Sequence, residues 1–150
     1  MNRILVTSDH SHESEVAFAM ANALAEKFDA QIDLLTVIED PAQAAVIYAL
    51  DNPIVPTKDV QEQYKEKVMN DLKVLASEHL PERNVTCHVE FAESAVHSKI
   101  LSFVKDHNID LVVMASHGRT GLKRILIGSV VERVVRECPC PILTVPSRGE

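Results

Sequence analysis

Tryptophan is absent from this chain of 150 residues, and aromatic residues make up only 4% of it. Its core must therefore be built from valine, isoleucine, leucine and alanine, which is typical of a parallel β-sheet covered by helices. No run of lysine and arginine exceeds two residues, and no apolar run approaches membrane-spanning length. With a net charge of −7, the composition argues against nucleic acid or an acidic membrane surface as the main partner.

Cysteine is also scarce, with three residues and hence no even set for a disulfide framework. Such sparse thiols suit a reducing compartment. The sequence passes from Met1-Asn2-Arg3 directly into an apolar run, without the pattern of a signal peptide. We therefore expect one cytoplasmic domain over residues 1–150, large enough to fold without a disulfide or a structural metal.

Five short apolar runs alternate with four segments of helical periodicity. The predicted strands are Ile4–Val6, Ile32–Ile38, Val85–Phe91, Leu111–Met114 and Ile142–Val145. The helical stripes run from Val16 to Phe28, Val60 to Leu75, Val96 to Val104 and Val130 to Val135. This alternation predicts an α/β fold with a single doubly wound, five-stranded parallel sheet.

The run from Val85 to Phe91 alternates strictly between apolar and polar side chains, which indicates a half-buried edge strand. With right-handed crossovers, an edge position for this strand favours the order 3-2-1-4-5. Strands one and four then flank the point where the order reverses, and a ligand crevice is expected beyond their carboxyl ends. Those ends are residues 7–9 and 115–117.

Three of the four glycines, Gly118, Gly121 and Gly128, lie in a stretch of eleven residues that follows the fourth strand. Glycine permits positive φ and close approach of backbone N–H groups to a ligand. Because Gly128-Ser129 stands where the last helix begins, the loop is a candidate phosphate site. The alternative is that these glycines only shape a tight connection and that Ser129 is an ordinary N-cap. Neither a Walker A loop nor GxGxxG is present.

Three segments resemble the universal stress protein (UspA-type) family, and the resemblance spans the whole chain. Residues 114–130 read MASHGRTGLKRILIGSV, residues 138–146 read CPCPILTVP, and residues 4–9 read ILVTSD. This resemblance implies an adenine nucleotide alpha hydrolase-like fold. It also implies that the protein binds ATP or a related adenine nucleotide and acts as a stress-response binding or regulatory protein.

In nucleotide-binding members of that family, the motif is Gly, two residues, Gly, nine residues and then Gly-Ser or Gly-Thr. Ala115 stands at the first position here and adds a methyl group where the family's backbone passes close to the ribose. By resemblance, Asp9 and the backbone around Val37 would meet the adenine and ribose, and the loop would hold phosphates bridged by Mg or Mn. The implied nucleotide-binding residues are Ser8, Asp9, Val37, Ala115, Gly118, Arg119, Gly128, Ser129 and Val130.

The sequence leaves other functions open. A dimeric interaction protein without nucleotide binding is one alternative, and an enzyme of the related adenine-nucleotide hydrolase or adenylyl-transfer type is another. No spacing places a nucleophile next to its base, so no catalytic residue is predicted and at most slow ATP hydrolysis is expected. His10, His12 and His117 could meet across the crevice, but we interpret them as loop residues rather than a metal site.

Two further segments carry predictions. The last strand, Pro141 to Pro146, is apolar and lies at an expected sheet edge, which predicts pairing with its twin in an antiparallel homodimer. The family resemblance implies the same dimer. The long connection from Glu39 to Lys58 is interpreted as a short helix with a flap over the crevice, or as a partner-binding segment.

Overall fold

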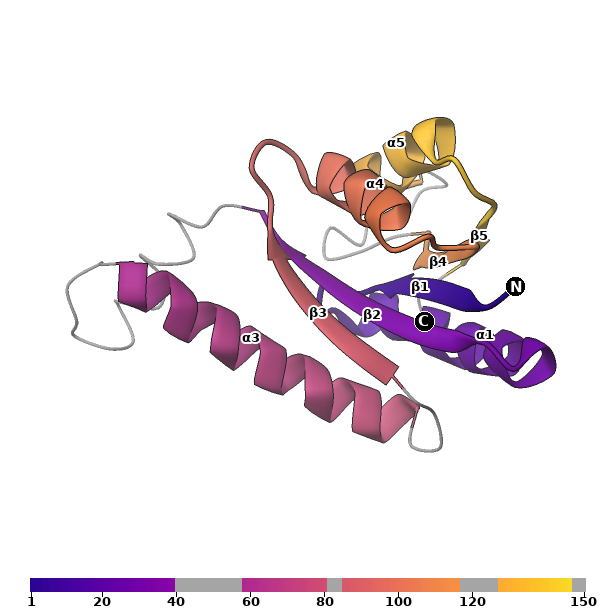
Figure 1. The fold of residues 1–150 in the computed structure, drawn as a ribbon, viewed down its shortest axis with the longest axis horizontal. Coiled ribbons are helices and arrows are strands. Elements are labelled where there is room, and N and C mark those ends of the chain that lie inside the picture. Colours follow the sequence, from indigo (N-terminus) through magenta and orange to yellow (C-terminus); the bar gives the residue numbers. More distant parts are fainter. Residues whose placement is uncertain (40–57, 81–84, 117–126, 147–150) are drawn as a thin grey trace.

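The computed structural model describes residues 1–39, 58–80, 85–116 and 127–146. The elements, shown in Figure 1, are β1 (Arg3–Thr7), α1 (His12–Phe28), β2 (Gln31–Ile38), α3 (Lys58–His79), β3 (Val85–Phe91), α4 (Val96–Asp106), β4 (Leu111–Ala115), α5 (Ser129–Glu137) and β5 (Ile142–Val145). The interpretation of the segment from Glu39 to Lys58 falls on residues 40–57, which lie outside the described part. Lys58 already belongs to α3.

The strands form one parallel sheet in the order β3-β2-β1-β4-β5. This confirms the predicted five-stranded α/β fold and its strand order. β3 lies at one edge, as its alternating pattern predicted, and β5 lies at the other. The central strand β1 pairs with β2 on one side and with β4 on the other.

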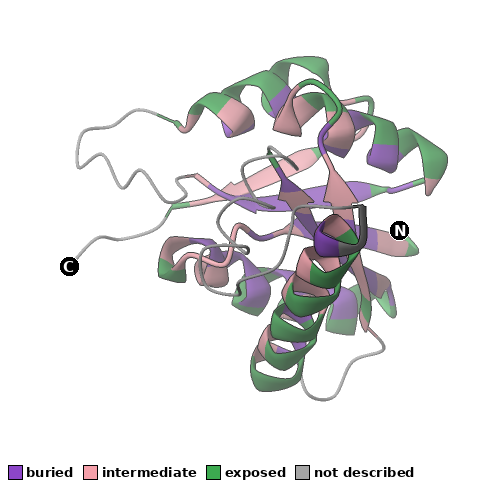
Figure 2. Cartoon of the chain, turned by 90° about the vertical axis from the view of Figure 1, so that its left-hand side faces the viewer, coloured by how far each residue is buried: buried purple, intermediate pink, exposed green. Residues whose placement is uncertain are grey.

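Helices cover both faces of the sheet (Figure 1). One core lies between the sheet and helices α1 and α3, where Phe18 and Leu72 are fully buried. The second core lies between the opposite face and helices α4 and α5, where Phe103 and Val134 are buried. Figure 2 shows the buried strands between these two layers, with the exposed helix faces outside. Burial on both faces explains why the central strands are continuous apolar runs.

Helix α1 is delimited by local side-chain chemistry. Its N-cap is Ser11, whose hydroxyl accepts a hydrogen bond from the N–H of Ser14, as expected for a helix-starting serine. Its C-cap is Asp29, which adopts the left-handed conformation with φ of 51° and donates its N–H to the Ala25 carbonyl. These two ends fix where the chain leaves β1 and enters β2. Within the described residues, no helix is long and apolar enough to cross a membrane.

Candidate functional site

The carboxyl ends of β1 and β4 lie next to each other because the two strands are paired and parallel. β1 leads into α1 on one face of the sheet, and β4 is followed by α5, which packs on the other face. The strand order therefore reverses between β1 and β4. Doubly wound sheets bind ligands at this position, beyond the carboxyl ends of the strands. The predicted site residues that are described lie at this end of the sheet.

Ser8 directly follows β1 and is only 6% exposed. Its N–H donates to the Leu35 carbonyl at 2.9 Å, which extends the pairing with β2. Its hydroxyl lies 3.0 Å from that of Ser14, whose own proton is donated to the Ser11 carbonyl at 2.7 Å. The Ser8 hydroxyl must therefore donate to Ser14, because the Ser14 proton is already used. The Ser8 side chain thus secures the β1–α1 connection, and its hydroxyl proton is not available to a ligand.

Asp9 and His10 form the turn between Ser8 and α1. The Asp9 carboxylate accepts hydrogen bonds from both the N–H and the hydroxyl of Ser11. His10 has a φ of 61°, a left-handed conformation that is uncommon for a residue with a side chain. Its Nε2 lies 3.1 Å from the Thr36 hydroxyl, which donates to the Ser8 carbonyl at 3.0 Å. Nε2 of His10 is therefore the donor, and the turn is held by β2 as well as by α1.

Val37 lies near the carboxyl end of β2, one strand further from β4 than Asp9 is. It pairs with Glu90 of β3 and is half-buried against the α4 side of the sheet. The structure therefore brings Val37 to the same end of the sheet as Asp9.

Ala115 is the last residue of β4, is 7% exposed and pairs with Val145 of β5. Its φ is not positive, so an alanine fits the strand conformation without strain. The next residue, Ser116, donates its N–H to the Val145 carbonyl at 2.8 Å and accepts the N–H of Gly128 at 2.9 Å. This last bond brings the start of α5 to the end of β4. Ala115 and Gly128 are thus neighbours through Ser116.

Helix α5 begins at Ser129, and Gly128 is its N-cap residue. The alternative that Ser129 is an ordinary N-cap is therefore wrong, because Ser129 is already the first helical residue. Gly128 has no side chain to cap this helix end, and no cap hydrogen bond from a side chain is present among the described residues. The first N–H groups of a helix have no partner within the helix, and they carry the positive end of the helix dipole. Since Ser129 is exposed and Val130 half-buried, this end can hold an anion.

Other predicted site residues, Gly118, Arg119 and Gly121, lie outside the described residues, as does His117 of the histidine set. His12 is exposed on α1, where it contacts Glu15 at 2.9 Å. Across the described ranges, no group of three or more histidine, cysteine, aspartate or glutamate side chains is placed to hold a metal ion. The described site therefore offers backbone donors, a carboxylate at Asp9 and the hydroxyl of Ser129.

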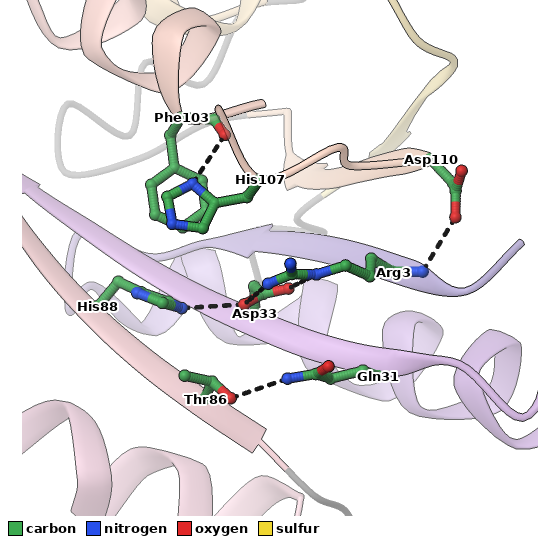
Figure 3. Close-up of polar contacts among 8 residues, drawn as sticks. All are labelled: Arg3, Gln31, Asp33, Thr86, His88, Phe103, His107 and Asp110. Atoms are coloured by element: carbon green, nitrogen blue, oxygen red, sulfur yellow. Dashed lines mark hydrogen bonds and ion pairs between the residues drawn. The ribbon is translucent and has the colours of Figure 1, made fainter. Parts of the chain in front are cut away.

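A buried carboxylate, Asp33, was not singled out from the sequence. It is fully buried in β2 and accepts two hydrogen bonds from Arg3, at 3.0 Å from Nε and 2.8 Å from Nη2. His88 of β3 donates a third from Nε2 at 2.9 Å. His88 packs edge-on against Phe103, on which the ring of His107 is stacked. Figure 3 shows Asp33 between Arg3 and His88.

The Asp33 cluster supports the fold rather than the candidate site. Arg3 begins β1, and Asp33 is the third residue of β2, so the cluster lies toward the amino ends of these strands. Burial raises the pKa of Asp33, but the hydrogen bonds from His88 and Arg3 outweigh it and the pKa is lowered overall. The available signal was a charged residue inside the apolar run Ile32–Ile38, which needs a partner when it is buried.

Comparison with known proteins gives a match along nearly the whole chain. The sequence model described as the universal stress protein family matches residues 1–146. A universal stress protein of Methanocaldococcus jannaschii is 29% identical over 143 residues, which cover 95% of this chain and 81% of the relative. Universal stress protein YxiE of Bacillus subtilis is 29% identical over 151 residues, which cover 96% of this chain and 98% of the relative.

Solved structures show the same fold. Protein MJ0577 of Methanocaldococcus jannaschii, also named a universal stress protein, superposes with a TM-score of 0.78 at 25% identity, covering 99% of this chain and 98% of that one. A universal stress protein in complex with cAMP gives a TM-score of 0.64 at 17% identity, covering 97% of both chains. A family member from Arabidopsis thaliana with AMP bound gives 0.63 at 15% identity, covering 99% and 94%.

Proposed function

Because this chain belongs to the universal stress protein family, we propose that it binds an adenine nucleotide at the carboxyl ends of β1 and β4. The phosphates would lie at the amino end of α5. In this proposal the protein acts in the cytoplasm as a stress-response binding protein rather than as an enzyme. Its free thiols at Cys87, Cys138 and Cys140 suit that reducing compartment.

The observation that carries the proposal is the environment of Gly128. Its φ is −56°, so its conformation does not require glycine. A Cβ atom built there would meet the Ser116 carbonyl oxygen at 3.6 Å and Cγ2 of Val131 at 3.9 Å, which are ordinary contacts. Neither strain nor packing within the described fold therefore calls for glycine. Close approach of a ligand to an uncapped helix end is the remaining advantage that a glycine provides here.

The nucleotide would be held mainly by backbone groups. We assign the phosphates to Gly118, Arg119, Gly128, Ser129 and Val130, and the adenine and ribose to Asp9 and the backbone of Val37, with Ala115 beside the sugar. A set of convergent N–H donors can bind phosphates without a dedicated lysine. Mg or Mn would enter with a triphosphate, coordinated chiefly by phosphate oxygens and water.

The nucleotide-bound relatives support adenine as the base. Two structures with this fold are complexes with cAMP and AMP, and a third, from Archaeoglobus fulgidus, is a complex with dAMP. These three ligands share an adenine and one phosphate but differ in the sugar and in the number of phosphate esters. They favour adenine nucleotides as a class, with ATP as one member to be tested against AMP.

Thermal unfolding with nucleotide tests the proposal. Protein shown to be free of nucleotide is expected to gain about 2.7 kcal/mol of stability from a ligand at about a hundred times its Kd. For a domain of this size that gain raises Tm by roughly 5–10 °C. Calorimetric scans with Mg-ATP, AMP and, as a control, Mg-GTP measure the shift and its base specificity. No shift with either adenine nucleotide at millimolar concentration would favour the alternative, a dimeric interaction protein that binds no nucleotide.

We also propose a homodimer through the last strand, Pro141 to Pro146. β5 is an edge strand, and its apolar residues Ile142, Leu143 and Val145 are only half-buried. An exposed apolar edge of this kind needs a cover, and pairing with a second copy provides one.

The register of β5 gives a clean test of this interface. The Pro141 and Val145 carbonyls accept hydrogen bonds from the β4 side. Successive residues of a strand direct their N–H and C=O groups to opposite sides. Because Pro141 and Val145 face β4, Thr144 directs its N–H away from β4, toward a strand added at the edge. Thr144→Pro should therefore remove a hydrogen bond to the partner without breaking the β4–β5 ladder. Light scattering is expected to show a dimer for the parent and for Thr144→Val, and a monomer for Thr144→Pro. A parent that is monomeric at micromolar concentration would contradict the dimer.

A further inference from the structure

Two of the three thiols lie in contact at the end of α5. The Sγ atoms of Cys138 and Cys140 are 3.6 Å apart. Sulfur atoms joined in a disulfide lie about 2.05 Å apart, so this is an unbonded pair of thiols, and both are free. Cys87 belongs to the opposite core, where its thiol faces the Leu72 carbonyl. The contact is therefore a local property of the Cys138-Pro139-Cys140 segment.

The backbone holds both members of the pair in place. Cys138 is the C-cap of α5, and its N–H donates to the Val134 carbonyl at 2.9 Å. On the other side, the carbonyl of Pro141 accepts the N–H of Val112 at 3.0 Å, which anchors the start of β5 on β4. The chain bends at Pro139 and Cys140 between these two anchors. The two sulfur atoms are thus oriented toward each other before anything binds, which lowers the entropic cost of using both as ligands.

The surroundings of the two sulfur atoms disfavour isolated thiolates. Burial, the neighbouring Cys138 thiol and the charge of Asp110 raise the pKa of Cys140 to about 12. The carboxyl end of a helix also carries the negative end of its dipole. These features make the pair a poor nucleophile, because reactive cysteines need an electropositive environment. A cation that binds both sulfur atoms offsets one of the two negative charges that loss of the thiol protons leaves, so the bound pair carries less charge than two free thiolates.

We propose that Cys138 and Cys140 form a binding site for a single soft, closed-shell cation such as Cu(I). Thiolates are the ligands that select Cu(I), whereas zinc in structural sites needs four ligands. In the part of the chain that the structure describes, no third histidine, cysteine or carboxylate joins the pair. Two-coordinate ligation by sulfur is therefore the chemistry that the site offers. Binding replaces the thiol protons by the metal, and the released protons pass to solvent.

Cu(I) binding by the reduced, nucleotide-free protein tests this assignment. We expect one Cu(I) per chain in an anaerobic competition against a chromophoric Cu(I) chelator. Cys138→Ala and Cys140→Ala should each weaken binding at least tenfold, since even the outer partners of metal ligands are worth roughly 10- to 100-fold. Cys87→Ala is the matched control and should retain the parent affinity. Far-UV circular dichroism of all variants establishes that each is folded.

The assignment would be overturned if Cys87→Ala lost the site, or if either pair variant bound Cu(I) as tightly as the parent. Formation of a Cys138–Cys140 disulfide that persists in the presence of millimolar glutathione would also overturn it, because the thiols would then not be available as ligands. None of these measurements uses a nucleotide. The result is therefore independent of the proposed function.

Discussion

Asp33→Ala is expected to lower the free energy of unfolding by about 2–4 kcal/mol, because removing one partner of a buried ion pair leaves the other charge without its counterion. Asp33 is fully buried and accepts three hydrogen bonds, two from Arg3 and one from His88. The side chain of Arg3 is 32% exposed and can turn partly toward solvent, so the loss should fall below that of a fully enclosed pair. For a domain of this size, Tm should fall by roughly 5–15 °C, measured by calorimetry and urea unfolding.

Gln31→Ala is the matched control for this variant. Gln31 begins the same strand and donates to the Thr86 hydroxyl at 2.9 Å, but this bond is exposed. Figure 3 shows both contacts on neighbouring strands. Because water can replace an exposed hydrogen bond, Gln31→Ala should change stability by about 0.5 kcal/mol or less. If Asp33→Ala changed the free energy of unfolding by an equally small amount, the hydrogen bonds of the cluster would only offset the cost of burying its charges.

The pH dependence of stability follows from the same carboxylate. The pKa of Asp33 is lowered in the folded state, against an unfolded value near 3.9. A group with a lowered folded pKa binds fewer protons in the folded protein, so its stabilisation is fully present above about pH 5, about one unit above the unfolded value. It is lost as the pH falls through the folded pKa. The stability difference between the parent and Asp33→Ala should therefore shrink in that acid range and stay constant between about pH 5 and pH 6.

Gly128→Asp is expected to weaken nucleotide binding while making the protein slightly more stable. Aspartate is among the best N-cap residues, and its charge complements the helix dipole, so a gain of about 0.3–1 kcal/mol is expected. The room around a Cβ at this position allows the side chain. A carboxylate about 4 Å from a phosphate costs roughly 1–4 kcal/mol in repulsion, which weakens binding by about tenfold or more. Calorimetric titration with Mg-ATP and unfolding without ligand measure the two effects separately.

Gly128→Asn separates charge from shape. Asparagine caps a helix about as well as aspartate and has nearly the same size, but it carries no charge. We expect it to stabilise the protein by a similar amount and to retain more affinity than Gly128→Asp. Equal affinity of the parent and Gly128→Asp would show that the phosphates do not approach the amino end of α5, and the proposed site would have to be abandoned.

The strand order was predictable because burial leaves a periodic trace in each strand. Leu111–Met114 reads as a continuous apolar run since both faces are covered, whereas Val85–Phe91 alternates since it lies at an edge. The bounds of β3 and β5 were predicted as observed. β1 extends to Arg3 and Thr7, and these ends are set by pairing with Gln31 and Leu35 on β2. A strand's partners, and not its own hydrophobicity, decide such terminal residues.

The start of the last helix was predictable from Gly128-Ser129, but the role of each residue was not. Which of two adjacent residues caps a helix depends on the backbone angles at the boundary, and these place Gly128 at the cap. The hydroxyl of Ser8 gives a second example. Its proton is committed to Ser14 by a chain of hydrogen bonds that only the folded β1–α1 connection brings together.

The sequence by itself therefore determined the fold family, the strand order and the end of the sheet where a ligand is expected, because these follow from local periodicity and short motifs. The tertiary structure alone decided which polar groups meet. Arg3, Asp33 and His88 are far apart in the chain and come together because three parallel strands are paired in one register. A residue's sequence neighbourhood does not contain the identity of its partners across a sheet, and burial makes those partners decisive for its energy.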